Sequence, residues 1–145
     1  MLVALCFFGL LRSLPITQES ILENVISPLA MAGMDIHIYL HSFQVGGKAA
    51  VNRKSSEALN KLGGLDYAVY DKQEEFDKTM NYSELATRNG FNGTDSSAKG
   101  SLINHIRALH SLQRVGQAVQ RNMHDMPSDH DYGWVIFIRP DMLYI

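Results

Sequence analysis

Several features that would define a class of protein are nearly absent from this sequence. It has one cysteine, Cys6, so no disulfide can form within the chain. Its apolar run at residues 2–11 is about half the length that a membrane-spanning helix needs. Its 13 Lys and Arg residues are scattered and are outnumbered by 15 Asp and Glu residues, which gives no basic patch for a polyanion. We therefore expect no disulfide framework, no membrane span in this chain and no nucleic-acid partner.

Motifs with a known chemistry are missing as well. The sequence contains no GxGxxG, no P-loop and no GxSxG. Hydrolase chemistry has no support, and sulfotransfer is disfavoured because no phosphate-cradling, glycine-rich loop follows the first apolar run. Cys6 lies inside that run and is expected to be a small buried residue.

The 6 histidines give no metal site by their spacing. His37 and His41 are expected on one face of a strand but more than about 13 Å apart, because a strand rises about 3.3 Å per residue. His105 and His110 diverge on a helix. The histidines are therefore not expected to bind a metal.

The sequence does not settle where the protein is located. No basic residue precedes the apolar run at residues 2–11, and no small-x-small cleavage pattern follows it, so a signal peptide is not indicated. These absences slightly favour the cytoplasm.

What is present predicts one α/β domain over residues 1–145. The chain is 46% apolar, which is enough for one hydrophobic core. Apolar runs and helical spacing alternate along it, which predicts a mainly parallel, Rossmann-like sheet with flanking helices. We expect strands at 3–8, 35–40, 65–70 and 134–138, helices at 17–29, 55–62, 74–80 and 102–119, and a long loop at 81–100.

The strand tips are the places to look for a ligand site, because parallel sheets bind ligands outside the carboxyl ends of their strands. The three tips are Gly9–Ser13, His41–Phe43 and Arg139–Asp141. A glycine lets a ligand approach the backbone, and an arginine can bind phosphate or a carboxylate through two hydrogen bonds. By spacing alone, Arg139 and Asp141 are equally compatible with a simple surface ion pair.

Four segments, taken in order, resemble a known family. They are VALCFFGLLRSL, DIHIYLHSF, SLINHIRALHSLQRV and YGWVIFIRPDMLY. They resemble glycosyltransferase-like proteins with the GT-A nucleotide-diphospho-sugar transferase fold, and the resemblance spans nearly the whole chain as the N-terminal part of such a domain. It implies a transferase that binds a nucleoside diphosphate sugar and passes the sugar to an acceptor hydroxyl whose identity stays open.

The resemblance also implies which residues bind. Gly9, Leu10 and Arg12 would contact the nucleotide, and Asp141 would be the metal-binding carboxylate for Mn²⁺ or Mg²⁺. The family's usual acidic motif is DXD, and here Arg139 stands in place of its first aspartate. Arg139 would then itself neutralise diphosphate charge.

Two residues of the long predicted helix, Asn104 and Arg107, are implied to reach the same site. A GT-A domain continues for about a hundred residues beyond its acidic motif, so we expect this chain to be a fragment that does not catalyse transfer by itself. The alternative is a non-catalytic α/β module that binds a partner.

Overall fold

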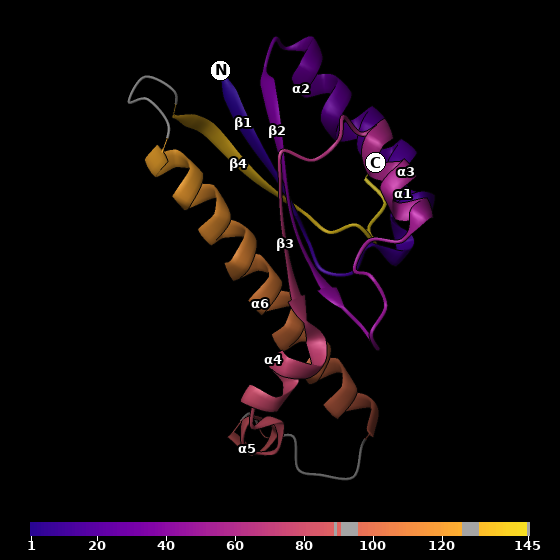
Figure 1. Cartoon of the computed structure of the whole chain (residues 1–145), viewed down its shortest axis with the longest axis vertical. Helices are drawn as coiled ribbons and strands as arrows, with labels where there is room; N and C mark the ends of the chain where they lie inside the picture. Colours follow the sequence, from indigo (N-terminus) through magenta and orange to yellow (C-terminus); the bar gives the residue numbers. More distant parts are fainter. Residues whose placement is uncertain (89, 91–95, 126–130, 145) are drawn as a thin grey trace.

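The structure is a computed structural model that describes residues 1–88, 90, 96–125 and 131–144. Figure 1 shows the arrangement of its strands and helices. In chain order the elements are β1 (Leu2–Phe8), the 3₁₀ turn η1 (Leu11–Ser13), α1 (Leu14–Ile21), the π-helical turn η2 (Leu22–Ile26), α2 (Ser27–Met31), β2 (Asp35–Gln44), α3 (Arg53–Lys61), β3 (Tyr67–Lys72), α4 (Gln73–Thr79), α5 (Tyr82–Arg88), α6 (Ser96–Asp125) and β4 (Tyr132–Ile138).

The strands form one parallel sheet in the order β3-β2-β1-β4. Residues Val3 to Phe7 of β1 are fully buried, as expected for an inner strand covered on both faces. The order 3-2-1-4 is that of a Rossmann fold up to its fourth strand, and it reverses between β1 and β4. The predicted α/β class with a mainly parallel sheet is confirmed.

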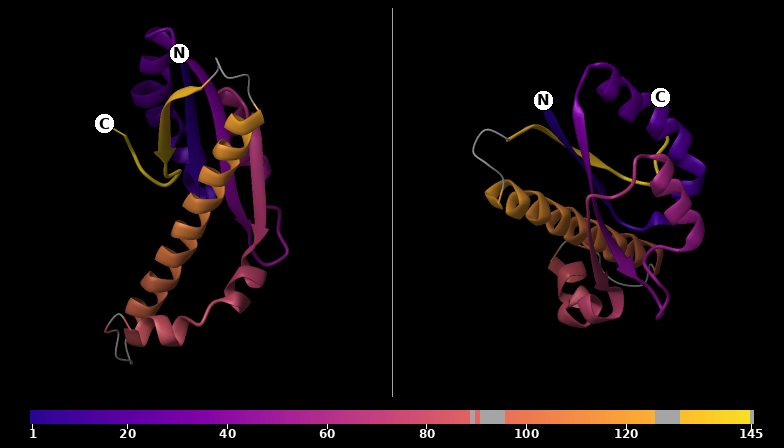
Figure 2. Two further views of the ribbon diagram at one scale, coloured as in Figure 1. Left: turned by 90° about the vertical axis from the view of Figure 1, so that its left-hand side faces the viewer. Right: turned by 45° about the horizontal axis from the view of Figure 1, so that its top comes forward.

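Helices cover both faces of this sheet (Figures 1 and 2). On one face, α1 and α3 pack Leu14 and Leu59 into a core that includes Phe7 of β1. On the other face, α6 packs Val115 against Cys6. Burial raises the pKa of the Cys6 thiol to about 12, so Cys6 is the small buried residue that its position predicts.

The segment predicted as a long loop, 81–100, is in part helical. It holds α5 and the first residues of α6, so the prediction was wrong there. Asn81 caps α5, because its side-chain oxygen accepts from the Glu84 N–H at 3.2 Å and its amide donates to the Glu84 carboxylate at 3.2 Å. This reciprocal contact is close to a capping box. Residues 89 and 91–95 lie outside the described part of the chain.

Strand β2 is longer than predicted. It runs to Gln44 rather than ending at Leu40, because Tyr39–Gln44 pair with Tyr67–Lys72 of β3. His41–Phe43, expected beyond the strand tip, therefore lie within β2. The third strand is shifted by two residues for the same reason, since its pairing with β2 rather than its local composition sets its ends.

Helix α6 was predicted at 102–119 and spans 30 residues. At 1.5 Å per residue it is about 45 Å long, whereas a seven-residue strand such as β4 covers about 23 Å. Its N-terminal half extends past the sheet beside α4 and α5 (Figure 1). Of the apolar stripe predicted on this helix, Val115 and Val119 are buried, but Leu109 is 51% exposed. Leu109 points about 200° away from the fully buried Ser111, two residues further along the helix.

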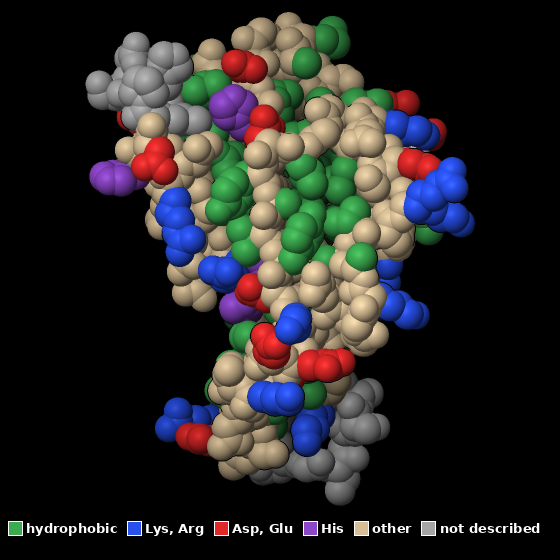
Figure 3. Space-filling model, viewed as in Figure 1, with side chains coloured by type: hydrophobic (Ala, Val, Ile, Leu, Met, Phe, Trp, Pro, Cys, Tyr) green, Lys and Arg blue, Asp and Glu red, His purple; other side chains and the backbone are tan. Residues whose placement is uncertain are grey.

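The surface over the sheet also differs from the surface around α4 and α5. In the view of Figure 3, apolar side chains gather over the middle of the molecule, while side chains of both charges cover its lower part, where α4 and α5 lie. None of the helices in the described part of the chain is both long and apolar enough to cross a membrane.

Candidate functional site

A pocket of about 450 Å³ opens at the carboxyl ends of the strands. Small-molecule sites commonly have volumes of roughly 300–1,000 Å³. β1 and β4 flank the point where the strand order reverses, which is where sheets of this kind bind ligands. We call this cavity the switch-point pocket. Its walls are formed by Phe8, Gly9, Leu10, Arg12, Ser13, Phe43, Val45, Gln73, Asn104, Arg107, Ala108, Ser111, Arg139, Pro140 and Asp141.

All the residues that the GT-A resemblance implies for a nucleotide sugar line this pocket. They are Gly9, Leu10, Arg12, Asn104, Arg107, Arg139 and Asp141. They come from the turn after β1, from α6 and from the turn after β4, so the fold brings three distant segments together. Their contact with a nucleotide sugar stays a prediction.

The turn after β1 exposes backbone to the pocket. Gly9 has a φ of 100°, which residues with a side chain rarely adopt. Its N–H donates to the His41 carbonyl oxygen at 3.2 Å, and a Cβ at this position would meet no atom within 4 Å. η1 begins two residues later, and the N-terminal end of a helical segment favours an anion. A phosphate group can therefore approach the backbone here.

The turn after β4 carries the Arg139–Asp141 pair. Arg139 Nη2 lies 2.8 Å from Asp141 Oδ2, and Arg139 Nε lies 3.1 Å from Asp141 Oδ1. Both side chains are about half exposed. Pro140 between them is fully buried, and its carbonyl oxygen accepts from the Thr17 hydroxyl of α1 at 2.6 Å. The proline and Thr17 thus hold the charged pair at the pocket rim.

The wall from α6 is fixed by a second ion pair. Arg107 Nη2 lies 2.5 Å from Asp77 Oδ2, and Arg107 Nε lies 3.0 Å from Asp77 Oδ1. The Tyr82 hydroxyl donates to Asp77 Oδ1 at 2.7 Å, and the Arg107 hydrogen bond lowers the pKa of Asp77. Asn104 Oδ1 accepts from Arg107 Nη1 at 3.3 Å. These contacts fasten α4 and α5 to α6 and set the position of Arg107.

Positive charge dominates the pocket wall, with three arginines and one carboxylate. Arg139 is paired with Asp141, and Arg107 is paired with Asp77. Arg12 forms no ion pair with any carboxylate that the structure describes. An anionic ligand would therefore meet one unpaired guanidinium and one exposed, weakly held pair.

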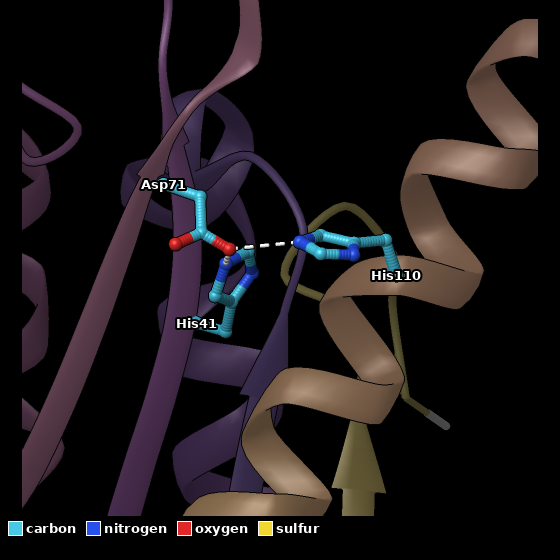
Figure 4. A group of neighbouring side chains, drawn as sticks. All are labelled: His41, Asp71 and His110. Atoms are coloured by element: carbon cyan, nitrogen blue, oxygen red, sulfur yellow. Dashed lines mark hydrogen bonds and ion pairs between the residues drawn. The ribbon is translucent and has the colours of Figure 1, made fainter. Parts of the chain in front are cut away.

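A second polar group, shown in Figure 4, lies beside the pocket. Ser111 links the two, because it lines the pocket and contacts His41. Asp71 Oδ2 of β3 lies 3.1 Å from His41 Nε2 of β2 and 2.8 Å from His110 Nε2 of α6. Arg114 donates to Asp71 through Nε at 2.9 Å and Nη2 at 3.2 Å. His41 Nδ1 lies 2.7 Å from Ser111 Oγ. We call His41, Asp71 and His110 the His–Asp–His cluster.

Burial and charge act in opposite directions in this cluster. Burial lowers the pKa of His41 to about 4 and outweighs the Asp71 carboxylate, which raises it. We take His41 as neutral at pH 7, because its side chain is fully buried. Burial also raises the pKa of Asp71, but hydrogen bonds from Arg114, His110 and His41 prevail and lower it to about 2. Asp71 is therefore an anion held by donors on three sides.

The sequence-based prediction, which found no metal site among the histidines, did not consider this group. It compared histidines close in sequence, whereas His41 and His110 come from different elements and meet at Asp71. One signal was available, since strands were expected at 35–40 and 65–70, and His41 and Asp71 directly follow those two segments. The docking of His110 on α6 had no local signal. Asp141, the predicted metal ligand, is not part of this group.

Comparison with known proteins adds little. No family model and no curated protein matches the chain. Among solved structures, NAD⁺ synthetase from Burkholderia pseudomallei aligns with 81% of this chain and 49% of that chain, with a TM-score of 0.46 and 15% sequence identity. The chain thus spans about half the length of that structure. A likeness of this extent does not identify a ligand for this chain.

Proposed function

We propose that this chain binds a nucleoside diphosphate sugar in the switch-point pocket and forms the donor-binding part of a glycosyltransferase. One observation carries the proposal: the residues that the GT-A resemblance implies all line a single pocket where the strand order reverses. The place suits a nucleotide, the volume suits a small molecule, and the arginines suit a diphosphate.

Each wall has a role in this proposal. The nucleotide lies against the exposed backbone at Gly9, and Arg12 and Arg139 bind oxygens of the diphosphate. During transfer the acceptor oxygen forms a bond to the anomeric carbon as the bond from that carbon to the diphosphate breaks. The arginines stabilise the negative charge that the leaving diphosphate takes up.

The Mn²⁺ or Mg²⁺ that the resemblance implies does not fit the residues present. Mg²⁺ requires a near-octahedral set of oxygen ligands. Asp141 is the single carboxylate among the pocket residues, and both its oxygens already accept hydrogen bonds from Arg139. In this proposal Arg139 therefore supplies the positive charge at the diphosphate.

A second candidate function is binding without transfer, as a non-catalytic module. It is favoured by the composition of the pocket wall, which contains no histidine and no carboxylate besides Asp141. The described wall thus offers no second residue that could act as a general base for an acceptor hydroxyl.

Nucleotide binding is tested by thermal unfolding of the chain with UDP or GDP, with and without Mn²⁺, against uridine and guanosine. At a concentration 100 times Kd, a ligand stabilises the folded state by about 2.7 kcal/mol, which is a shift of several degrees in Tm. Arg12→Ala and Arg139→Ala should lose most of this shift. Arg53→Ala, an exposed residue of α3 paired with Glu57, should keep it.

The proposal is overturned if neither diphosphate raises Tm, or if Arg53→Ala loses as much of the shift as Arg12→Ala. Asp141→Ala then tests whether a metal takes part in binding. Because the residues present do not fit Mn²⁺ or Mg²⁺, Mn²⁺ should add nothing to the shift in Tm, and Asp141→Ala should keep most of that shift.

A further inference from the structure

The His–Asp–His cluster gathers three potential metal ligands, two imidazoles and one carboxylate, in one place. The His41, Asp71 and His110 ligand atoms all lie within 4.8 Å of one another. They come from β2, β3 and α6, and the two histidine nitrogens both point at the same carboxylate oxygen (Figure 4). We propose that these residues form a binding site for Zn²⁺ or a divalent transition metal of similar preference. This inference does not rest on nucleotide binding.

The distances leave room for the metal after a small movement. A tetrahedral Zn²⁺ with bonds of about 2.0–2.1 Å places its ligand atoms about 3.3 Å apart. Asp71 Oδ2 now lies 3.1 Å from His41 Nε2 and 2.8 Å from His110 Nε2. Each nitrogen therefore needs to move a few tenths of an ångström away from Asp71 Oδ2. The two histidine nitrogens, which lie within 4.8 Å of each other, need to reach the same separation of about 3.3 Å.

The contacts around the ligands already have the form that metal sites use. A histidine that binds a metal through one nitrogen usually donates its other N–H to an outer partner. His41 Nδ1 has Ser111 Oγ at 2.7 Å for that role, and the hydroxyl can either donate or accept. The proton of His41 can therefore move from Nε2 to Nδ1 as the metal binds, and Ser111 Oγ changes from donor to acceptor.

The third ligand is held by packing. The His110 ring lies against Phe76, with ring centroids 4.2 Å apart, and against Phe43, with ring centroids 5.5 Å apart. Its Nε2 is thereby aimed at Asp71 before any metal arrives. The side chains of Asp71 and His110 remain 25% and 21% exposed, so water can take a fourth position, as in sites with three protein ligands.

Arg114 determines which metal is favoured. It donates to both Asp71 oxygens and can stay on Oδ1 when Oδ2 binds the metal. Its charge offsets that of the carboxylate, which weakens binding of cations that depend on negative oxygens, such as Mg²⁺ and Mn²⁺. The two imidazole nitrogens then provide most of the affinity, and imidazole suits Zn²⁺.

The test is titration of the full chain with Co²⁺, followed by visible absorption, and then displacement of Co²⁺ by Zn²⁺. One equivalent of Co²⁺ should bind with the strong d–d bands of a four-coordinate site, and Mg²⁺ should not compete. His110→Ala should weaken binding by about a hundredfold or more, and Ser111→Ala by about tenfold. His105→Ala, an exposed histidine on the same helix, should bind as the unaltered chain does.

Absence of a one-to-one site, or equal binding by His110→Ala and His105→Ala, overturns the proposal. Circular dichroism establishes that each variant is folded. If His110→Ala does not fold, the Co²⁺ spectrum of the unaltered chain decides by itself, because weak bands typical of six-coordinate, oxygen-bound Co²⁺ contradict the site.

Discussion

The switch-point pocket and the His–Asp–His cluster are neighbours, because Ser111 lines the pocket and contacts His41 of the cluster. Their charged groups differ in exposure and in the number of hydrogen-bond partners. In the pocket, the Arg139–Asp141 pair is about half exposed and Arg12 has no acidic partner among the described residues. In the cluster, Asp71 accepts hydrogen bonds from three side chains and His41 is fully buried.

This difference in exposure distinguishes charged residues that are available to a ligand from charged residues that hold strands and helix together. Exposed charges at strand tips contribute little to folding and remain available to a ligand. In the network between strands and helix, removal of Asp71 would leave the fully buried His41 without its hydrogen-bond partner at Nε2, which destabilises the fold. The same comparison can be tested with matched variants.

The largest expected effect is a difference in the free energy of unfolding between variants of two aspartates, Asp71 and Asp141, which both pair with arginine. Asp71→Ala should lower the free energy of unfolding by about 3–5 kcal/mol, because Arg114 and His41 lose their acceptor inside the protein. Asp141→Ala should lower it by less than about 1 kcal/mol. Urea denaturation at pH 7 measures both, and losses of equal size would erase the distinction between the two regions.

The pH dependence of stability tests the buried histidine. His41 has an ordinary pKa of 6.5 and a pKa of about 4 in the folded chain. Below 6.5 the unfolded chain binds a proton that the folded chain does not, so stability falls as the pH falls. The expected loss is roughly 3 kcal/mol between pH 6.5 and 4. Asp71, with its pKa lowered to about 2, should add a further loss as the pH falls below about 4.

Urea midpoints measured across this pH range give the loss, and an NMR titration of the His41 ring gives its pKa directly. His105→Ala is the control and should show the same pH dependence as the unaltered chain. A His41 ring that titrates near its ordinary value would contradict the buried, neutral state inferred for the cluster.

Substitution of Gly9, which lines the pocket, is compared with substitution of Gly116, which does not. Gly9→Ala should destabilise the chain by about 1–2 kcal/mol, because alanine is strained at a φ of 100°, and it should weaken UDP binding. Gly116→Ala in α6 meets no atom within 4 Å and should stabilise by about 0.5–1 kcal/mol. Thermal unfolding and UDP titration measure the two effects. A Gly9→Ala chain that binds UDP normally would remove the turn from the proposed site.

The smallest expected effect concerns the support of the pocket rim. Thr17→Val removes the hydroxyl that donates to the Pro140 carbonyl at 2.6 Å and should cost about 1 kcal/mol. UDP affinity should fall a few fold, because the turn that carries Arg139 is held less firmly. Thr87→Val, which removes a bond on the exposed face of α5, is the matched control. Equal UDP affinity in the two variants would show that Thr17 does not position the turn.

The parts of the fold that sequence predicts are those set by contiguous residues. The apolar run of β1 and the run of β4 each end abruptly, at Gly9 and at Arg139, so the strand tips could be located without knowing how the strands pair. The parallel-sheet rule then placed both tips on one edge. Part of the pocket lining followed from those two positions and from the GT-A resemblance, namely Gly9, Leu10, Arg12, Asn104, Arg107, Arg139 and Asp141.

The parts that could not be predicted depend on contacts between distant elements. β2 continues through His41 because β3 pairs with it, and nothing in its own composition shows where that pairing ends. His110 meets Asp71 only once α6 is docked on the sheet. The start of α5 is different, because Asn81 and Glu84 form a recognisable cap that the polar, glycine-containing composition of the region obscured.

The pairing of β1 with β4 joins the two ends of the chain, with Leu2 opposite Tyr132. Closing this loop costs more entropy than closing the shorter loops between β1 and β2 and between β2 and β3, so we expect β1, β2 and β3 to associate first and β4 to dock late in folding. The pocket comes into existence only at that late step. A ligand that bridges the two strand tips would therefore slow unfolding much more than it speeds folding, and it would lengthen the lifetime of the native state.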